Sequence, residues 1–247
     1  MTPHIIVLDS CPSTNSHLAA LADAPHGTVV AAVEQTAGRG QRGNSWEAEP
    51  GRNLTFSQLL RPAALPAPRQ FELSMAVSLA IADAIDAHLP AGVRCTIKWP
   101  NDIYVGMRKI CGILIENKLA GISIERAIIG AGINVNQRKF ISDAPNPTSI
   151  INENGGLETP LQPFLTEVTQ RIIDTFDNYD SAPDPAALKE RYMARLMWTS
   201  GEHPFSTPER GTFLDHIADV AFDGTLTLGC GSRHAFKEIS YIIPPQK

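Results

Sequence analysis

A segment rich in glycine and arginine, EQTAGRGQRGNSW, has the residue types that bind anions. It directly follows the apolar run TVVAAV, which predicts a buried strand over residues 28–33. Three glycines would let the backbone approach an anion closely, and two guanidinium groups match phosphate or carboxylate geometry. The residues in question are Gly38, Gly40, Gly43, Arg39 and Arg42. The segment is neither a Walker motif nor a GxGxxG helix start. Two interpretations are therefore possible, an anion-binding loop or a solvated turn.

A lysine on an alternating segment is the second candidate for chemistry. Apolar and polar side chains alternate along RCTIKW, residues 94–99, which predicts a strand with Lys98 on its polar face. An ammonium that faces the same cavity as the Gly/Arg loop could stabilise charge that develops in a transition state. The simpler alternative is an exposed strand lysine. Asn101 and Asp102 follow Pro100 in an order typical of a turn.

Three further segments combine ordinary structural roles with groups that could bind a ligand. Ser13, Thr14 and Asn15 can begin a short helix, and their hydroxyl and amide groups can also bind a polar ligand. RKICGILIE, residues 108–116, reads as a strand. GAGINVN, residues 130–136, reads as a strand that runs into a turn, where backbone and Asn amides are available to a ligand.

The elements that must position these groups alternate between strands and helices. Apolar periodicity predicts strands at 28–33, 54–60, 94–99, 110–116 and 127–133, and helices near 13–22, 71–89, 161–179 and 186–197. Short β-rich runs separated by turns follow, at 212–214, 216–222, 225–228 and 235–243, which is typical of a small barrel. The stretch SAPDP, residues 181–185, is the nearest thing to a linker. We predict a main domain over residues 1–198 and a small β domain over 199–247.

Composition and charge exclude several classes of protein. The 247 residues carry a formal net charge of −5, whereas a nucleic-acid-binding domain usually has a basic excess. The apolar run at residues 5–8 is much shorter than a signal-peptide core or a membrane span, so we expect a cytoplasmic protein with no membrane contact. Four cysteines without a CxxC pair indicate reduced, mostly buried thiols. No histidine lies in a ligand-spaced cluster, so we predict no bound metal site.

The order of these segments resembles one family. Ser-Thr-Asn, then QTAGRGQRG with a tryptophan, then KWPND, then RKICGILIE, then GAGINVN together resemble the biotin protein ligases. The resemblance runs from His4 to about Val135. It continues weakly to the C-terminus, where DGTL and FKEI are similar to the family's SH3-like terminal domain.

The resemblance implies an α+β fold and a two-step reaction. The family's catalytic domain is related to class II aminoacyl-tRNA synthetases, with a mixed, largely antiparallel sheet, flanking helices and a C-terminal SH3-like β-barrel. Its members activate biotin with ATP, accompanied by Mg²⁺, to biotinyl-5'-AMP. They then transfer biotin to a lysine of a biotin carboxyl carrier protein, a partner that this chain would share.

The resemblance also assigns site residues. Arg39 and Lys98 match the catalytic cations near the biotin carboxylate and the α-phosphate of ATP, where charge builds up during the reaction. The matches to the biotin site are Ser13, Thr14, Asn15, Gln35, Gly38, Arg39, Gly40, Gln41, Lys98, Gly112 and Ile113. The matches to the ATP and adenylate site are Arg39, Arg42, Trp46, Lys98 and Asn134, with Lys109 a weaker match. Trp46 could stack on adenine or could be plain core.

Two departures and two rivals accompany the resemblance. Gln41 stands where many members have arginine, and the winged helix-turn-helix domain of the regulatory members is not expected, because Ser-Thr-Asn comes so early in this sequence. The sequence indicates no dedicated base for the carrier lysine. A lipoate or octanoyl ligase shares the fold, and a catalytically silent biotin sensor would keep the binding residues alone. Both Arg39 and Lys98 are present, which favours an active ligase.

We predict that the chain does not bind duplex DNA specifically, with or without biotin and ATP. Many regulatory members begin with a winged helix-turn-helix domain, whereas this sequence starts almost at Ser-Thr-Asn and is acidic overall. An electrophoretic shift assay at physiological salt checks the prediction. A saturable complex that depends on DNA sequence would contradict it.

Overall fold

The fold is built on one large mixed sheet. A computed structural model describes residues 1–40, 46–63, 65–141 and 146–245. The sheet has seven strands in the order β1-β2-β3-β7-β6-β5-β4. Their bounds are β1 His4–Cys11, β2 Thr28–Gln35, β3 Leu54–Leu60, β4 Cys95–Lys98, β5 Asp102–Val105, β6 Arg108–Ala120 and β7 Ser123–Ile133. The β1–β2 pair is parallel and the other pairs are antiparallel, which confirms the expected mixed, largely antiparallel sheet.

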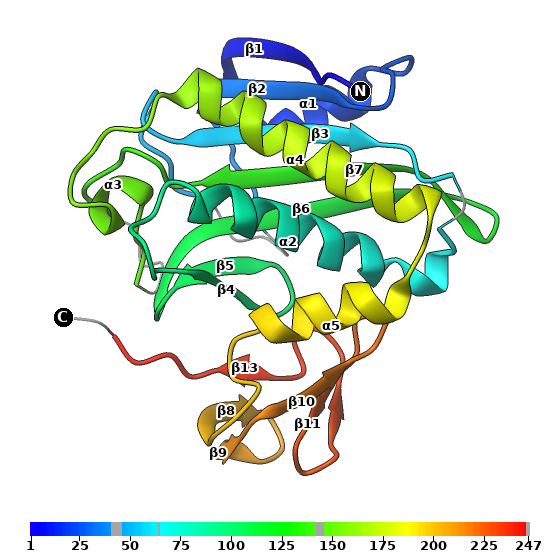
Figure 1. Cartoon of the computed structure of the whole chain (residues 1–247), viewed down its shortest axis with the longest axis vertical. Coiled ribbons are helices and arrows are strands. Elements are labelled where there is room, and N and C mark those ends of the chain that lie inside the picture. Colours follow the sequence, from blue (N-terminus) through cyan, green and yellow to red (C-terminus); the bar gives the residue numbers. More distant parts are fainter. Residues whose placement is uncertain (41–45, 64, 142–145, 246–247) are drawn as a thin grey trace.

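Helices cover both faces of this sheet. The helices are α1 Thr14–Ala20, α2 Phe71–Asp86, α3 Ile150–Glu153, α4 Leu161–Ser181 and α5 Pro185–Arg195. Adjacent residues of a strand point to opposite faces. On β3, Ser57 donates a hydrogen bond into α1, whereas Gln58 donates one to the carbonyl of Thr169 in α4. The α1 and α4 faces are therefore opposite, and Figure 1 shows α2 and α4 crossing the sheet on the same side.

The main core lies between the sheet and the α2–α4 layer. Thirteen of the sixteen residues of α2 are buried, which explains its long apolar stripe. Its predicted end near residue 89 is three residues too far, because the chain leaves the helix in a tight turn where the His88 N–H donates to the Ile85 carbonyl. Between α4 and α5, the stretch predicted as a linker is a tight helix–helix turn. Asp184 caps α5 by accepting from the Ala187 N–H, and Pro185 opens the helix.

The C-terminal region forms two small sheets, ordered β10-β11-β12 and β13-β8-β9. The strands are β8 His203–Thr207, β9 Gly211–Asp215, β10 Ile217–Val220, β11 Leu226–Leu228, β12 Arg233–His234 and β13 Ser240–Tyr241. A small β unit was expected here, but the described strands do not pair into a closed barrel. The last three have only two or three residues each, too few to continue the pairing. Within the run predicted at 235–243, only Ser240–Tyr241 is a strand, and a turn precedes it.

The C-terminal sheets pack directly under the main sheet (Figure 1). Buried side chains of this region, among them Phe205, Ile217 and Leu226, belong to the same apolar cluster as Ile97 and Trp99 of the main sheet. The Trp99 Nε1–H also donates to the Gly224 carbonyl at 3.1 Å. The two regions share one apolar core, and the predicted division at residue 198 remains a prediction.

The predicted thiol state agrees with the structure. Cys11, Cys95 and Cys111 are buried, Cys230 is exposed, and all four are free. Across the described residues, no helix combines the length and apolarity that a membrane crossing requires.

We expect that Ile81→Ala on α2 lowers the free energy of unfolding by about 2–5 kcal/mol, because it empties a packed site in the core. Ile81 is fully buried, whereas Ile122, in the turn between β6 and β7, is 82% exposed. Ile122→Ala makes the same chemical change and is the matched control, with an expected effect within about 0.5 kcal/mol. Urea denaturation followed by circular dichroism measures both. Equal losses for the two variants would contradict this account of the core.

Candidate functional site

A cavity of about 240 Å³ crosses the sheet from α1 to β4. It collects side chains from segments far apart in the chain: the start of α1, the Gly/Arg loop, the β4–β5 turn, β6, β7 and the turn before β13. Of the residues predicted for the site, it brings together Ser13, Thr14, Asn15, Gln35, Arg39, Gly40, Trp46, Lys98, Lys109, Gly112 and Ile113.

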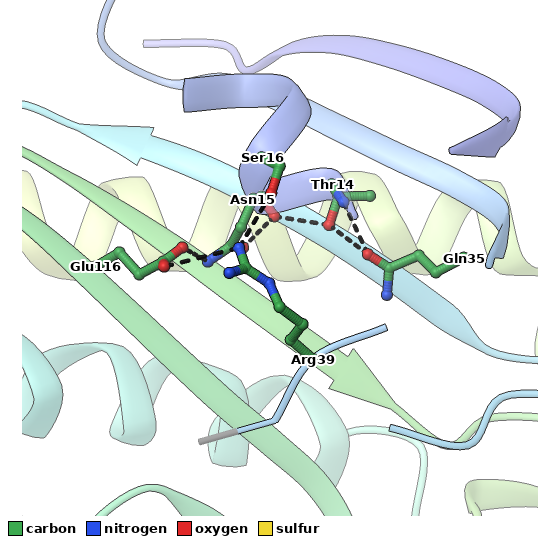
Figure 2. A network of polar contacts seen from close by, with 7 residues as sticks. Thr14, Asn15, Ser16, Gln35, Arg39 and Glu116 are labelled. Atoms are coloured by element: carbon green, nitrogen blue, oxygen red, sulfur yellow. Dashed lines mark hydrogen bonds and ion pairs between the residues drawn. The ribbon is translucent and has the colours of Figure 1, made fainter. Parts of the chain in front are cut away.

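The α1 end of the cavity is a connected polar network (Figure 2). The Thr14 hydroxyl donates to Gln35 Oε1 at 3.1 Å, and the Thr14 backbone N–H donates to the same oxygen at 2.8 Å. Ser57 on β3 contacts both Thr14 Oγ1, at 2.7 Å, and Asn15 Oδ1. Asn15 Nδ2 donates to Glu116 Oε2 at 2.6 Å. These hydrogen bonds hold the polar groups in fixed positions.

Glu116 on β6 sets the direction of this network. A carboxylate only accepts hydrogen bonds, so the amide nitrogen of Asn15 must face Glu116. Asn15 Oδ1 consequently faces Ser57, whose hydroxyl can donate to it. Asn15 and Ser57 are both buried, so a reversed amide would leave unfavourable contacts at each end. Glu116 therefore orients the Asn15 amide and, through it, the Ser57 hydroxyl, although Glu116 itself does not line the cavity.

Arg39 extends from the Gly/Arg loop to the same network. Its Nη2 lies 3.0 Å from Ser16 Oγ and 3.8 Å from Glu116 Oε1. Both partners of the ion pair are about half exposed, so the pair contributes little stability and leaves the guanidinium able to turn toward an anion. Figure 2 shows the side chain reaching across from the loop toward α1.

The β4 end of the cavity holds two lysines around one carboxylate. Lys98 Nζ lies 3.9 Å from Asp102 Oδ2, and Lys109 Nζ lies 2.7 Å from Asp102 Oδ1. Lys98 Nζ also lies 4.6 Å from the ring centroid of Tyr241 on β13, which places a cation over an aromatic face. Burial lowers the pKa of Lys98; Asp102 opposes this shift and Lys109 adds to it. Two cations around one carboxylate leave this end with a net positive charge.

Glycines make the floor of the cavity. Gly130 pairs with Ser57 on one side and Leu114 on the other, so it lies in the same row as the polar network. A Cβ at Gly130 would lie 2.3 Å from Asn15 Oδ1, and one at Gly132 would lie 2.3 Å from Trp46 Cε2. Neither approach is sterically possible with a side chain. The GAG of the predicted strand-to-turn segment is thus explained by close packing of Asn15 and Trp46.

Trp46 lies over this floor and closes the Gly/Arg loop. Its ring is close to Gly132 and Gly112, which pair across β7 and β6, and Lys109 Nζ lies 5.6 Å from the ring centroid. The Trp46 backbone N–H donates to the Gly38 carbonyl at 3.2 Å, which joins the two ends of the loop. Trp46 is therefore a cavity residue and not part of the main apolar core.

Other predicted residues are placed differently. Gly38 does not line the cavity but forms the base of the loop. Asn134 is buried outside the cavity lining, where its Nδ2 donates to the Thr148 carbonyl at 2.8 Å, so its predicted contact with a nucleotide remains a prediction. Gln41 and Arg42 lie outside the described residues.

Several lining or supporting residues were not identified from the sequence. Ser57 was read only as part of a buried strand, and Glu116 only as the end of RKICGILIE. Both are polar residues on apolar strands, and strand alternation places both on the face of the sheet that contacts α1. This pattern is the sequence feature that could have identified them. Tyr241 and Lys237 reach the site through the packing of the C-terminal region, which no local pattern indicates.

Comparison with known proteins decides the family. The model of the Biotin/lipoate A/B protein ligase family matches residues 7–134. A biotin--[acetyl-CoA-carboxylase] ligase of Mycobacterium tuberculosis is 33% identical over 230 residues, covering 90% of this chain and 81% of that protein. The chain belongs to the biotin/lipoate A/B protein ligase family. A ligase of the same name from Paracoccus denitrificans is 32% identical over 192 residues, covering 74% of this chain and 77% of that protein.

Longer relatives and solved structures complete the comparison. The bifunctional ligase/repressor BirA of Bacillus subtilis is 38% identical over 140 residues, which span 56% of this chain and only 42% of that protein. The structure of a biotin protein ligase from Aquifex aeolicus in complex with biotin and ATP superimposes with a TM-score of 0.78 at 23% identity, covering 98% of this chain and 99% of that one. This likeness confirms the expected ligase fold.

We expect that Gly132→Ala destabilises the chain by about 1–3 kcal/mol, because the new methyl group overlaps the Trp46 ring. In a Trp46→Ala background the same substitution has space, so its effect becomes much smaller. Urea denaturation of the four proteins, followed by far-UV circular dichroism, gives the coupling energy, with an expected size of about 1 kcal/mol or more. Equal losses in both backgrounds would show that Trp46 does not lie over the glycine floor.

Proposed function

We propose that this chain activates biotin with ATP and transfers the biotinyl group to a lysine of a biotin carboxyl carrier protein. The observation that carries the proposal is the polar network of Thr14, Asn15, Ser57 and Gln35 at the α1 end of the cavity. The ureido ring of biotin has two N–H donors and one carbonyl acceptor, which hydroxyl and amide groups can satisfy. The names of the Mycobacterium and Paracoccus relatives support the same substrate.

The positive groups of the cavity suit the first step. A biotin carboxylate oxygen attacks the α-phosphorus of ATP, the new bond gives a mixed anhydride, and the bond to the leaving pyrophosphate breaks. Lys98 and Arg39 would stabilise the extra negative charge on the phosphoryl oxygens. Arg39 would leave Glu116 and Ser16 to do this, which its half-exposed position permits. Trp46 offers a flat face for adenine.

The second step is acyl transfer to the carrier. The neutral amine of the carrier lysine attacks the acyl carbon, an amide forms, and AMP leaves with the electrons of the anhydride bond. The mixed anhydride is easily hydrolysed, so its binding within the cavity would protect it from water. We assign no residue as the base that takes the amine proton.

Mg²⁺ would enter with ATP, as part of the substrate. Asp102, a carboxylate of the cavity lining, is already paired with two lysines. Among the described residues no cluster of three acidic, histidine or cysteine side chains is placed to hold a metal ion. Magnesium usually keeps several waters and binds proteins through substrate phosphates, so it needs no cluster of protein ligands here. We also propose a cytoplasmic location, which four free cysteines support.

Transfer of label decides between this function and its rivals. The purified chain is incubated with ATP, a carrier domain and labelled biotin or labelled lipoate, and label on the carrier is measured. The proposal requires biotin on the carrier. Lipoate alone on the carrier would identify a lipoate ligase, whose dithiolane ring has no N–H or carbonyl group for the polar network. Biotin that binds without transfer would identify a sensor.

We expect that Lys98→Ala and Arg39→Ala each slow adenylate formation by about 10²–10³, since each removes a cation from the reacting centre. Neither should much reduce the free energy of unfolding. Pyrophosphate release in single-turnover experiments measures the rate. Arg171→Ala is the matched control, because Arg171 is an exposed cation of α4 paired with Glu167, outside the cavity lining. Near-wild-type rates for either cavity variant would remove that residue from the reacting centre.

A further inference from the structure

A turn between β12 and β13 brings a lysine to the cavity in an uncommon backbone conformation. The Glu238 N–H donates to the Ala235 carbonyl at 3.1 Å, and Glu238 Oε2 accepts from the Ala235 N–H at 2.7 Å. Lys237 is the third residue of this turn and has φ +79°. Turns with a positive φ at this position favour glycine or asparagine, because a Cβ is strained there. The sequence places a lysine there instead.

Aromatic packing fixes this turn against the main sheet. The rings of Phe236 and Trp99 meet edge to face with centroids 5.9 Å apart, and Trp99 directly follows β4. A few residues further along, the Tyr241 ring faces Lys98 Nζ. Phe236 and Lys237 both line the cavity, as does the predicted catalytic lysine, Lys98. The position of Lys237 is therefore a built feature of the site.

Ion pairing distinguishes Lys237 from Arg39, Lys98 and Lys109, the other cations of the cavity. Arg39 pairs with Glu116, and Lys98 and Lys109 pair with Asp102, at distances of 2.7–3.9 Å. Within the described ranges of the chain, Lys237 forms no ion pair within 4.0 Å and its side chain is exposed. An incoming anion would meet Lys237 without having to displace a protein carboxylate.

We propose that Lys237 binds the β- and γ-phosphates of ATP and offsets the charge of the departing pyrophosphate. The inference rests on the proposed function, in which Arg39 and Lys98 serve the α-phosphate and the carboxylate. When the bond from the α-phosphorus to the bridging oxygen breaks, that oxygen keeps the electron pair, so the leaving group gains charge that a nearby ammonium stabilises. Strained backbone conformations often occur at functional sites, and Lys237 is the non-glycine residue with a positive φ that lines the cavity among the described residues.

Equilibrium binding to the full chain tests the inference. ATP and AMP are titrated by calorimetry in the absence of biotin, for wild type and for Lys237→Gly. We expect the Kd for ATP to rise about 10-fold or more, the loss typical of one charge-assisted contact, and the Kd for AMP to stay nearly unchanged. Lys237→Arg should retain most of the ATP affinity. Lys118→Ala, which removes an exposed cation outside the cavity, should bind ATP as wild type does.

Thermal unfolding separates this role from a structural one. Glycine is well suited to φ +79°, so Lys237→Gly should melt at or above the wild-type temperature while it binds ATP more weakly. Unchanged ATP binding, equal losses for ATP and AMP, or a lower melting temperature would overturn the inference. A wild-type chain that binds ATP through Lys237 but forms no biotinyl-AMP would defeat the proposed function and leave the phosphate contact supported.

Discussion

The cavity depends on three glycines on the α1 face of the central strands β6 and β7. Gly130 and Gly132 on β7, with Gly112 opposite on β6, leave a trough that Asn15 and Trp46 occupy at van der Waals distance. A side chain at Gly130 would overlap Asn15 of α1, and a side chain at Gly132 or Gly112 would overlap the Trp46 ring. Steric exclusion by a Cβ therefore determines where both the polar network and the aromatic ring lie.

Polar side chains inside this trough are tolerated because they satisfy one another. Buried hydroxyl and amide groups cost free energy unless they are hydrogen-bonded, and here Glu116 gives the chain of contacts a charged, accept-only end. The same carboxylate pairs with Arg39. At the other end Asp102 pairs with Lys98 and Lys109. These carboxylates reduce the repulsion between the cations that the site holds close together.

The sequence predicted the helices and strands better than the contacts between segments that are distant in the chain. Periodicity found the long helices and most sheet strands, because apolar residues such as Leu79 of α2 and Phe176 of α4 recur along one buried face of their own helix. It missed β1, β5 and β8, and it extended the 235–243 run through a turn. β5 and β8 have only four and five residues, too few to show a period, and β1, with only one buried residue, shows no regular apolar alternation. Resemblance supplied the cations and the Ser-Thr-Asn segment. It could not supply Ser57, Glu116 or Lys237, whose roles arise from strand register and from the packing of distant segments.

One consequence of this arrangement concerns the order in which the chain is made. The cavity takes groups from α1 near the beginning of the sequence and from the turn at Ala235–Glu238 near its end. Synthesis releases N-terminal segments first, at about 5–20 residues per second. A chain still attached to the ribosome can therefore form much of the main sheet while one wall of the cavity is missing. Full capture of a ligand must wait until the segment beyond β12 has left the exit tunnel, well after the groups of α1 have emerged.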